Sequence, residues 1–114
     1  MARESLTEEQ IKDELGRLAD WRHVGGSLAT VYKLPTAAAA LALIAAVGEV
    51  AEELNHHPDL DWRYNRVILR FSSHDAGSAV TARDVEAAHR CTLRAAALDA
   101  VAQPERLPQD PAGT

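Results

Sequence analysis

The long apolar stretch in the middle of the chain limits the possible folds more than any other feature. It reads "TAAAALALIAAVGEVAEELNHHP", from Thr36 to Pro58. Its most apolar part, residues 37–48, is about 12 residues long and Glu49 follows it, whereas a helix needs roughly 20 apolar residues to cross a bilayer. One apolar stripe repeats at helical spacing and comprises Leu43, Val47, Val50 and Leu54. The stretch therefore predicts a buried helix that packs on a sheet.

The segments before this helix predict another helix and a pair of strands. Thr7 is a good N-cap, and Gln10 three residues later completes a capping box, so a helix should begin there. Residues 21–32 carry apolar side chains on both sides of Gly25 and Gly26, which supply the backbone freedom that a tight turn requires. We expect two short strands joined by this turn.

The segments after the long helix predict more strands and a third helix. Residues 61–73 alternate between apolar and polar side chains, as either one strand or two short strands bent near Asn65. Thr81 and Asp84 have the spacing of an N-cap and the third residue of a helix, which should end before Pro104. The element order predicts an α+β fold: a single domain with an antiparallel β-sheet of about four strands and three helices packed on one face.

Length and charge narrow the class of protein. A chain of 114 residues fits one domain, which we expect to span residues 1–103, followed by a disordered, dispensable tail over residues 104–114. The net charge is −5 and no Lys/Arg cluster occurs, so neither nucleic acid nor a membrane surface is an expected partner. Cys91 is the only cysteine, which excludes an internal disulfide, and the polar start "MARESLTEEQ" lacks an apolar signal region. These features predict a cytoplasmic location.

Three of the five histidines lie in one short segment, from Glu52 to His74. Glu52 and His56 are four residues apart and would share a helix face, His57 lies at the turn that leaves the helix, and His74 ends the following strand region. These side chains could converge at one edge of the sheet. Three interpretations stay open: a helix-stop signal without chemistry, an acid–base site, or a metal site. The metal interpretation is the weakest, because zinc motifs on helices pair two histidines at this spacing.

The same segment resembles the signature of the pterin-4a-carbinolamine dehydratases. An acidic residue four positions before His-His-Pro, an aromatic residue, a third histidine and a downstream aspartate all occur at permitted spacings. The matching residues are Glu52, His56, His57, Pro58, Tyr64, His74 and Asp84. The strings "LADWRHVGGSLATVYKL" and "YNRVILRFSSHDAG" are also similar to the family's strands, so the resemblance covers residues 6–98. The chain departs from the family pattern at Asp20, where glycine is frequent, and in the long helix, which lacks phenylalanine.

The resemblance implies a hydro-lyase that removes water from 4a-hydroxytetrahydropterin to give the quinonoid dihydropterin, without any cofactor or metal. It implies catalytic roles for His56 and His74 as acid and base, and for Glu52 as the residue that tunes His56. It implies a substrate-binding group of His57, Trp21 and Asp84, in which Asp84 holds the loop of His74. Pterin is then the small-molecule partner.

The resemblance and the sequence together also predict self-association. The broad apolar face of the long helix and a free sheet edge favour a homodimer or homotetramer. An alternative function is a non-catalytic oligomeric partner protein built on the same fold. The intact set of histidines favours the enzyme.

Overall fold

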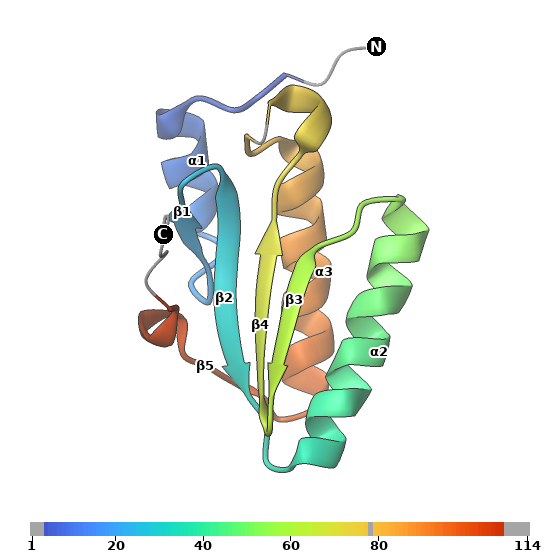
Figure 1. Ribbon diagram of the computed structural model, residues 1–114. Helices are drawn as coiled ribbons and strands as arrows, with labels where there is room; N and C mark the ends of the chain where they lie inside the picture. The colour runs from blue at the N-terminus through green and yellow to red at the C-terminus, as the bar shows by residue number, and fades with distance from the viewer. Residues whose placement is uncertain (1–3, 78, 109–114) are drawn as a thin grey trace.

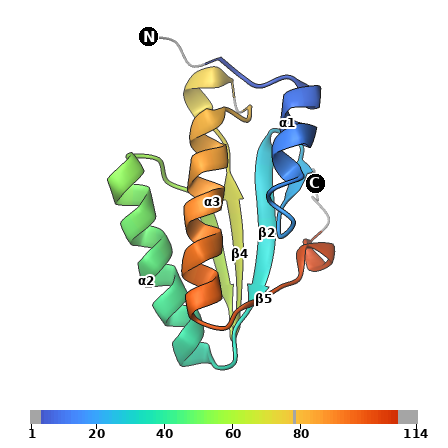
Figure 2. The same cartoon turned by 180° about the vertical axis from the view of Figure 1, so that it is seen from behind.

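The computed structural model describes residues 4–77 and 79–108. Figure 1 looks onto the open face of a five-stranded antiparallel sheet, and Figure 2 shows the helices that cover the other face. The strands lie in the order β1-β2-β4-β3, and a short fifth strand also pairs with β2. The elements are α1 (Glu8–Leu15), β1 (Arg22–Val24), β2 (Ser27–Lys33), α2 (Ala37–Leu54), β3 (Asp59–Arg63), β4 (Arg66–Phe71), η1 (His74–Ala76), α3 (Ala82–Ala97), β5 (Val101–Ala102) and η2 (Pro104–Arg106). The predicted α+β class, with helices on one face, is confirmed.

Local hydrogen bonds fix the helix starts where the sequence predicts them. The Thr7 and Gln10 side chains each accept a hydrogen bond from the other's backbone N–H, at 3.1 and 2.8 Å, so the predicted capping box forms. The Thr36 hydroxyl accepts from the Ala39 N–H at 3.0 Å and starts α2. α2 packs Leu43, Val47 and Val50 into the core. Among the described residues, the helices are too short or too polar to cross a membrane.

The two hairpins have the tight turns that their sequences indicate. Gly25 adopts a φ of +57° between β1 and β2, as a turn with left-handed backbone requires. The second alternating segment proves to be two strands, β3 and β4, joined through Tyr64, whose φ is +56°, and Asn65. Asn65 ties this turn to the end of β2, because it exchanges hydrogen bonds with the Leu34 backbone. The two hairpins join where β2 pairs with β4 at the centre of the sheet.

The core lies between the sheet and the helices. Its largest side chains on the sheet are Leu28, Tyr32, Val67, Leu69 and Phe71. α3 contributes small residues, so that its backbone approaches the sheet closely: Ala87, Ala88, Cys91 and Ala95. Burial of these apolar side chains is the main force that holds the helices on the sheet.

A partly buried polar network includes Asp20, where the family pattern often has glycine. The Tyr32 hydroxyl donates to Asp20 Oδ2 at 2.7 Å, and the Thr30 hydroxyl donates to the Asp20 carbonyl. Burial raises the pKa of Tyr32, so the phenol stays a hydrogen-bond donor. Trp21 donates from Nε1 to the Thr92 hydroxyl at 2.9 Å and thereby joins this network to α3.

The chain after α3 continues along the sheet into the first residues of the expected tail. β5 pairs with the end of β2, and the Gln103 N–H donates to the Val31 carbonyl at 2.7 Å. Pro104 is buried and η2 continues the fold. Residues 109–114 of the predicted tail lie outside the described residues. β5 itself was not predicted, because a two-residue strand has no alternating pattern that a sequence could reveal.

Candidate active site

Three chain segments meet at the upper end of the sheet in Figure 1. The end of α2 leads into residues 55–58, the end of β4 leads into η1, and α3 begins there. The antiparallel register explains why the first two segments are neighbours: Asp59 at the start of β3 pairs with Arg70 near the end of β4. The sequence-distant histidine segments therefore lie at the same end of the fold.

A Schellman motif ends α2 and turns His56 inward. Asn55 adopts the left-handed conformation, with φ of +50°. The His56 N–H donates to the Ala51 carbonyl at 2.9 Å and the Asn55 N–H donates to the Glu52 carbonyl at 3.3 Å, which are the two bonds of that motif. His56 is consequently no longer on the helical face that Glu52 occupies.

The carboxylate partner of His56 is Asp84. His56 Nε2 lies 2.5 Å from Asp84 Oδ1; the His56 side chain is 9% exposed and that of Asp84 is 0% exposed. The imidazole also stacks on Phe71, with ring centroids 5.9 Å apart and planes 22° apart. Because an ionised carboxylate only accepts hydrogen bonds, Nε2 carries a proton, and Nδ1 is the atom left to exchange one. Such a pair can hold an imidazole in one orientation for proton transfer.

Asp84 also connects His56 to the loop of His74. Asp84 Oδ2 accepts from the Ser73 hydroxyl at 2.9 Å and from the Thr81 N–H at 2.8 Å. The hydroxyls of Ser73 and Thr81 are 2.8 Å apart. Ser73 is buried and directly precedes His74, the first residue of η1, which is exposed. One buried carboxylate thus caps α3, orients His56 and fixes the backbone next to His74.

Glu52 pairs with His57, not with His56 as the sequence led us to expect. The distance from His57 Nε2 to Glu52 Oε2 is 2.6 Å, and the side chains are 56% and 78% exposed. The expected pairing assumed that the helix continues through His56, whereas the left-handed Asn55 ends it one residue earlier. The site therefore contains one buried and one exposed imidazole–carboxylate pair.

The remaining residues of the sequence motif occupy two different places. Trp21 is buried in the core, and its ring lies 6.0 Å from Phe71, so it supports the ring on which His56 stacks. Tyr64 lies in the turn after β3, at the opposite end of that strand from His57. Tyr64 therefore serves the hairpin turn rather than the histidine cluster.

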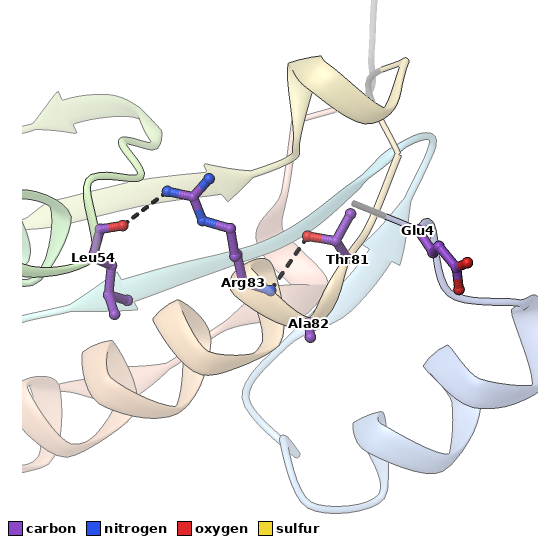
Figure 3. A pocket seen from close by; sticks show the side chains of 5 residues that line it. All are labelled: Glu4, Leu54, Thr81, Ala82 and Arg83. Atoms are coloured by element: carbon purple, nitrogen blue, oxygen red, sulfur yellow. Dashed lines mark hydrogen bonds between the residues drawn. The ribbon is translucent and has the colours of Figure 1, made fainter. Parts of the chain in front are cut away.

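Sequence reasoning missed three contributors: Phe71, Ser73 and Arg83. Arg83 lines a cavity of about 500 Å³ beside the end of α2, together with Glu4, Leu54, Thr81 and Ala82 (Figure 3). A signal was available for Ser73, since it directly precedes a motif histidine. Among the described residues, no group of three or more His, Cys, Asp and Glu side chains is arranged to hold a metal ion.

The sequence and the fold of this chain are similar to those of known proteins. The family model for pterin 4 alpha carbinolamine dehydratase matches residues 4–93. Similar proteins called "Putative pterin-4-alpha-carbinolamine dehydratase" come from Streptomyces coelicolor, 40% identical over 79% of this chain and 89% of that protein, and from Nocardia farcinica, 38% identical over 79% and 94%. A crystal structure of "transcriptional coactivator/pterin dehydratase" from Brucella melitensis is 28% identical, with a TM-score of 0.76 over 80% of this chain and 98% of the other.

These matches cover most of the chain and of each relative. The chain belongs to the pterin 4 alpha carbinolamine dehydratase family.

Proposed function

We propose that the protein is an enzyme that dehydrates 4a-hydroxytetrahydropterins to quinonoid dihydropterins, a step in the recycling of tetrahydropterin cofactors in the cytoplasm. The observation that carries the proposal is the buried His56–Asp84 pair, which is bonded through Ser73 to the loop of His74. An imidazole held by a carboxylate that also binds the loop of a second histidine is suited to paired proton transfer near neutral pH. Family membership supports the assignment of this chemistry.

The reaction is an elimination, and its steps define what the site must do. The C4a–O bond breaks, and the hydroxyl leaves as water after receiving a proton from a general acid. The N5–H bond gives up its proton to a general base, and its electron pair forms the N5=C4a double bond. His56, through Nδ1, and His74 are the two groups that we assign to these proton transfers. No redox change occurs, and the protons balance.

The other residues have supporting roles in this proposal. His57 and Glu52 are exposed and form a polar pair that can orient the pterin, with Glu52 fixing the His57 tautomer through Nε2. Asp84 has no exposed surface and Trp21 is in the core. We therefore assign Asp84 and Trp21 to positioning of His56, in place of the substrate contact expected from the sequence.

The test of the proposal is turnover by the purified protein. Carbinolamine would be generated by an aromatic amino acid hydroxylase, and its absorbance would be followed with and without this protein. We expect the decay to accelerate in proportion to protein concentration, and expect the double variant His56→Ala, His74→Ala to remove the acceleration. A wild-type protein that is folded and leaves the decay rate unchanged would contradict the proposal.

A second candidate function is that of a partner protein, because the Brucella melitensis neighbour is described as a transcriptional coactivator as well as a pterin dehydratase. In that case the protein would act as a homo-oligomer that stabilises another protein, and histidine variants would keep this effect. Loss of function in those variants would favour the enzyme.

A further inference from the structure

Arg83 makes an unusual contact between two helices. It lies in the first turn of α3, and its Nη2 donates to the Leu54 carbonyl at 2.8 Å and to the Asn55 carbonyl at 2.5 Å. Figure 3 shows the guanidinium reaching across to Leu54. These carbonyls are at the end of α2, where the helix itself provides no partners. Arg83 therefore completes the C-terminus of α2 from a neighbouring helix.

The charge of Arg83 fits this place. The C-terminus of a helix carries a partial negative charge that a cation stabilises. α2 has no basic residue in its last turn, where Glu52 and Glu53 occur instead. A cation from α3 thus supplies the charge that α2 lacks, directly before the histidine pair.

Arg83 and Asp84 hold the same short segment at two points. Asp84 binds the His56 ring, and Arg83 binds the backbone carbonyls of the two residues before it. The Schellman bonds hold the N–H groups of Asn55 and His56, and Arg83 adds bonds to the carbonyls of Leu54 and Asn55. Asp84 thus holds the His56 ring, and Arg83 gives a further hold on the backbone from which His56 and His57 follow.

We propose that Arg83 is a positioning residue of the site: it sets the orientation of His56 and His57 through the backbone of α2 and does not touch the reacting atoms. Its importance for turnover rests on the proposed function, whereas its effect on the histidine rings does not. A role in substrate binding through the cavity is the competing explanation, since Arg83 also lines that cavity.

Two other arginines of α3 provide matched controls. Arg94 Nη1 bonds to Glu49 Oε1 at 2.7 Å, and Arg90 Nη1 bonds to Glu53 Oε1 at 3.3 Å. Both also join α3 to α2, but through exposed carboxylates rather than through backbone carbonyls. Such exposed ion pairs contribute little to stability. If any α3–α2 link sufficed, substitution of Arg90 would have the same effect as substitution of Arg83.

The experiment compares Arg83→Met, Arg83→Lys and Arg90→Met in the full chain. Met keeps the aliphatic part of the side chain without its donors, and Lys restores one donor and the charge. The first measurement is the imidazole ¹⁵N and ¹H NMR spectrum across pH, which reports the tautomers and pKa values of His56 and His57 independently of activity. The second is kcat and KM for the carbinolamine.

We expect Arg83→Met to shift the His56 and His57 imidazole signals and to lower kcat by up to about 10²-fold with little change in KM, as misplaced catalytic groups do. Arg83→Lys should recover part of both effects, and Arg90→Met should change neither. Unchanged imidazole signals in Arg83→Met, or equal changes in Arg90→Met, would overturn the proposal. A raised KM with normal kcat and normal signals would assign Arg83 to substrate binding. If Arg83→Met does not fold, the same criteria apply to Arg83→Lys against Arg90→Lys.

Discussion

At the scale of single residues, the three histidines occupy different environments and should respond differently to substitution. His56 is buried and held by Asp84, His57 is exposed and paired with Glu52, and His74 begins η1. The replacements His56→Ala and His74→Ala should lower kcat by about 10²–10⁴-fold, since each removes a proton-transfer group. His57→Ala should mainly raise KM.

Circular dichroism provides the folding control for these three variants. Chelators added to the wild-type protein should leave the rate unchanged, because the proposed elimination uses only imidazole acids and bases. Wild-type turnover in all three variants would contradict the acid–base assignment, as would a rate that depends on a removable metal.

A second prediction at this scale concerns stability at alkaline pH. Burial raises the pKa of Cys91 from 9.0 to about 12, and burial also raises the pKa of Tyr32 above 10.0. Each group binds its proton more tightly in the folded than in the unfolded protein, so its contribution is fully present below pH 9 to 10 and is lost as the pH rises further. We expect the free energy of unfolding, measured with urea, to fall between about pH 9 and pH 11.

The double variant Cys91→Ala, Tyr32→Phe separates this effect from general alkaline repulsion. Its unfolding free energy should be lower at pH 7, because the hydrogen bond to Asp20 is lost, but should decline less steeply above pH 9. If the unfolding free energy of the double variant declined as steeply as that of the wild type, other titrating groups would dominate the pH dependence.

At the scale of the elements, the Schellman turn at Asn55 determines where the histidines point. Its φ of +50° is costly for a residue with a Cβ but not for glycine. Asn55→Ala should lower the free energy of unfolding by about 1–2 kcal/mol, whereas Asn55→Gly should be nearly neutral. Chemical denaturation of both variants checks this. Equal free energies of unfolding for the two variants would show that the left-handed backbone at Asn55 does not determine the stability difference.

The same turn shows which parts of the structure a sequence can predict. Thr7 and Thr81 start helices where expected, because each cap depends on residues only two or three positions away. Helical spacing predicted that Glu52 pairs with His56. This prediction was wrong, because the single left-handed residue Asn55 changes the direction of the chain that follows it. Arg83 could not be found at all, since its partners are backbone carbonyls, which every residue has.

At the scale of the whole molecule, the C-terminal segment belongs to the domain. A chain that ends after Gln103 should be less stable by about 1–2 kcal/mol than one that ends after Pro108, because it loses the buried Pro104 and η2. Thermal unfolding of the two truncated proteins provides the comparison, and both contain β5. Identical melting temperatures would restore the expectation, made from the sequence, that the segment is dispensable.

Self-association is also a property of the whole molecule. Leu41 on α2 is 49% exposed, and β3 leaves one edge of the sheet without a neighbour among the described residues. Both features favour a homodimer or homotetramer. Light scattering at micromolar concentration should give two or four times the 12.3 kDa chain mass. A species of 12.3 kDa alone would contradict this, and Leu41→Glu should shift the distribution towards it.

The turn between β3 and β4 has a consequence for folding. Apart from Trp21, every residue with a role in the proposed function lies between Glu52 and Asp84, and this turn lies between the two histidine segments. Hairpins with such tight turns close in about 1–10 μs, long before distant parts of a chain meet. Closure of this one hairpin brings the segment of His56 and His57 close to that of His74. The entropy cost of closing the loop between the two histidine segments is therefore overcome by a short-range event, whereas the pairing of β2 with β4 joins segments that are farther apart in the chain.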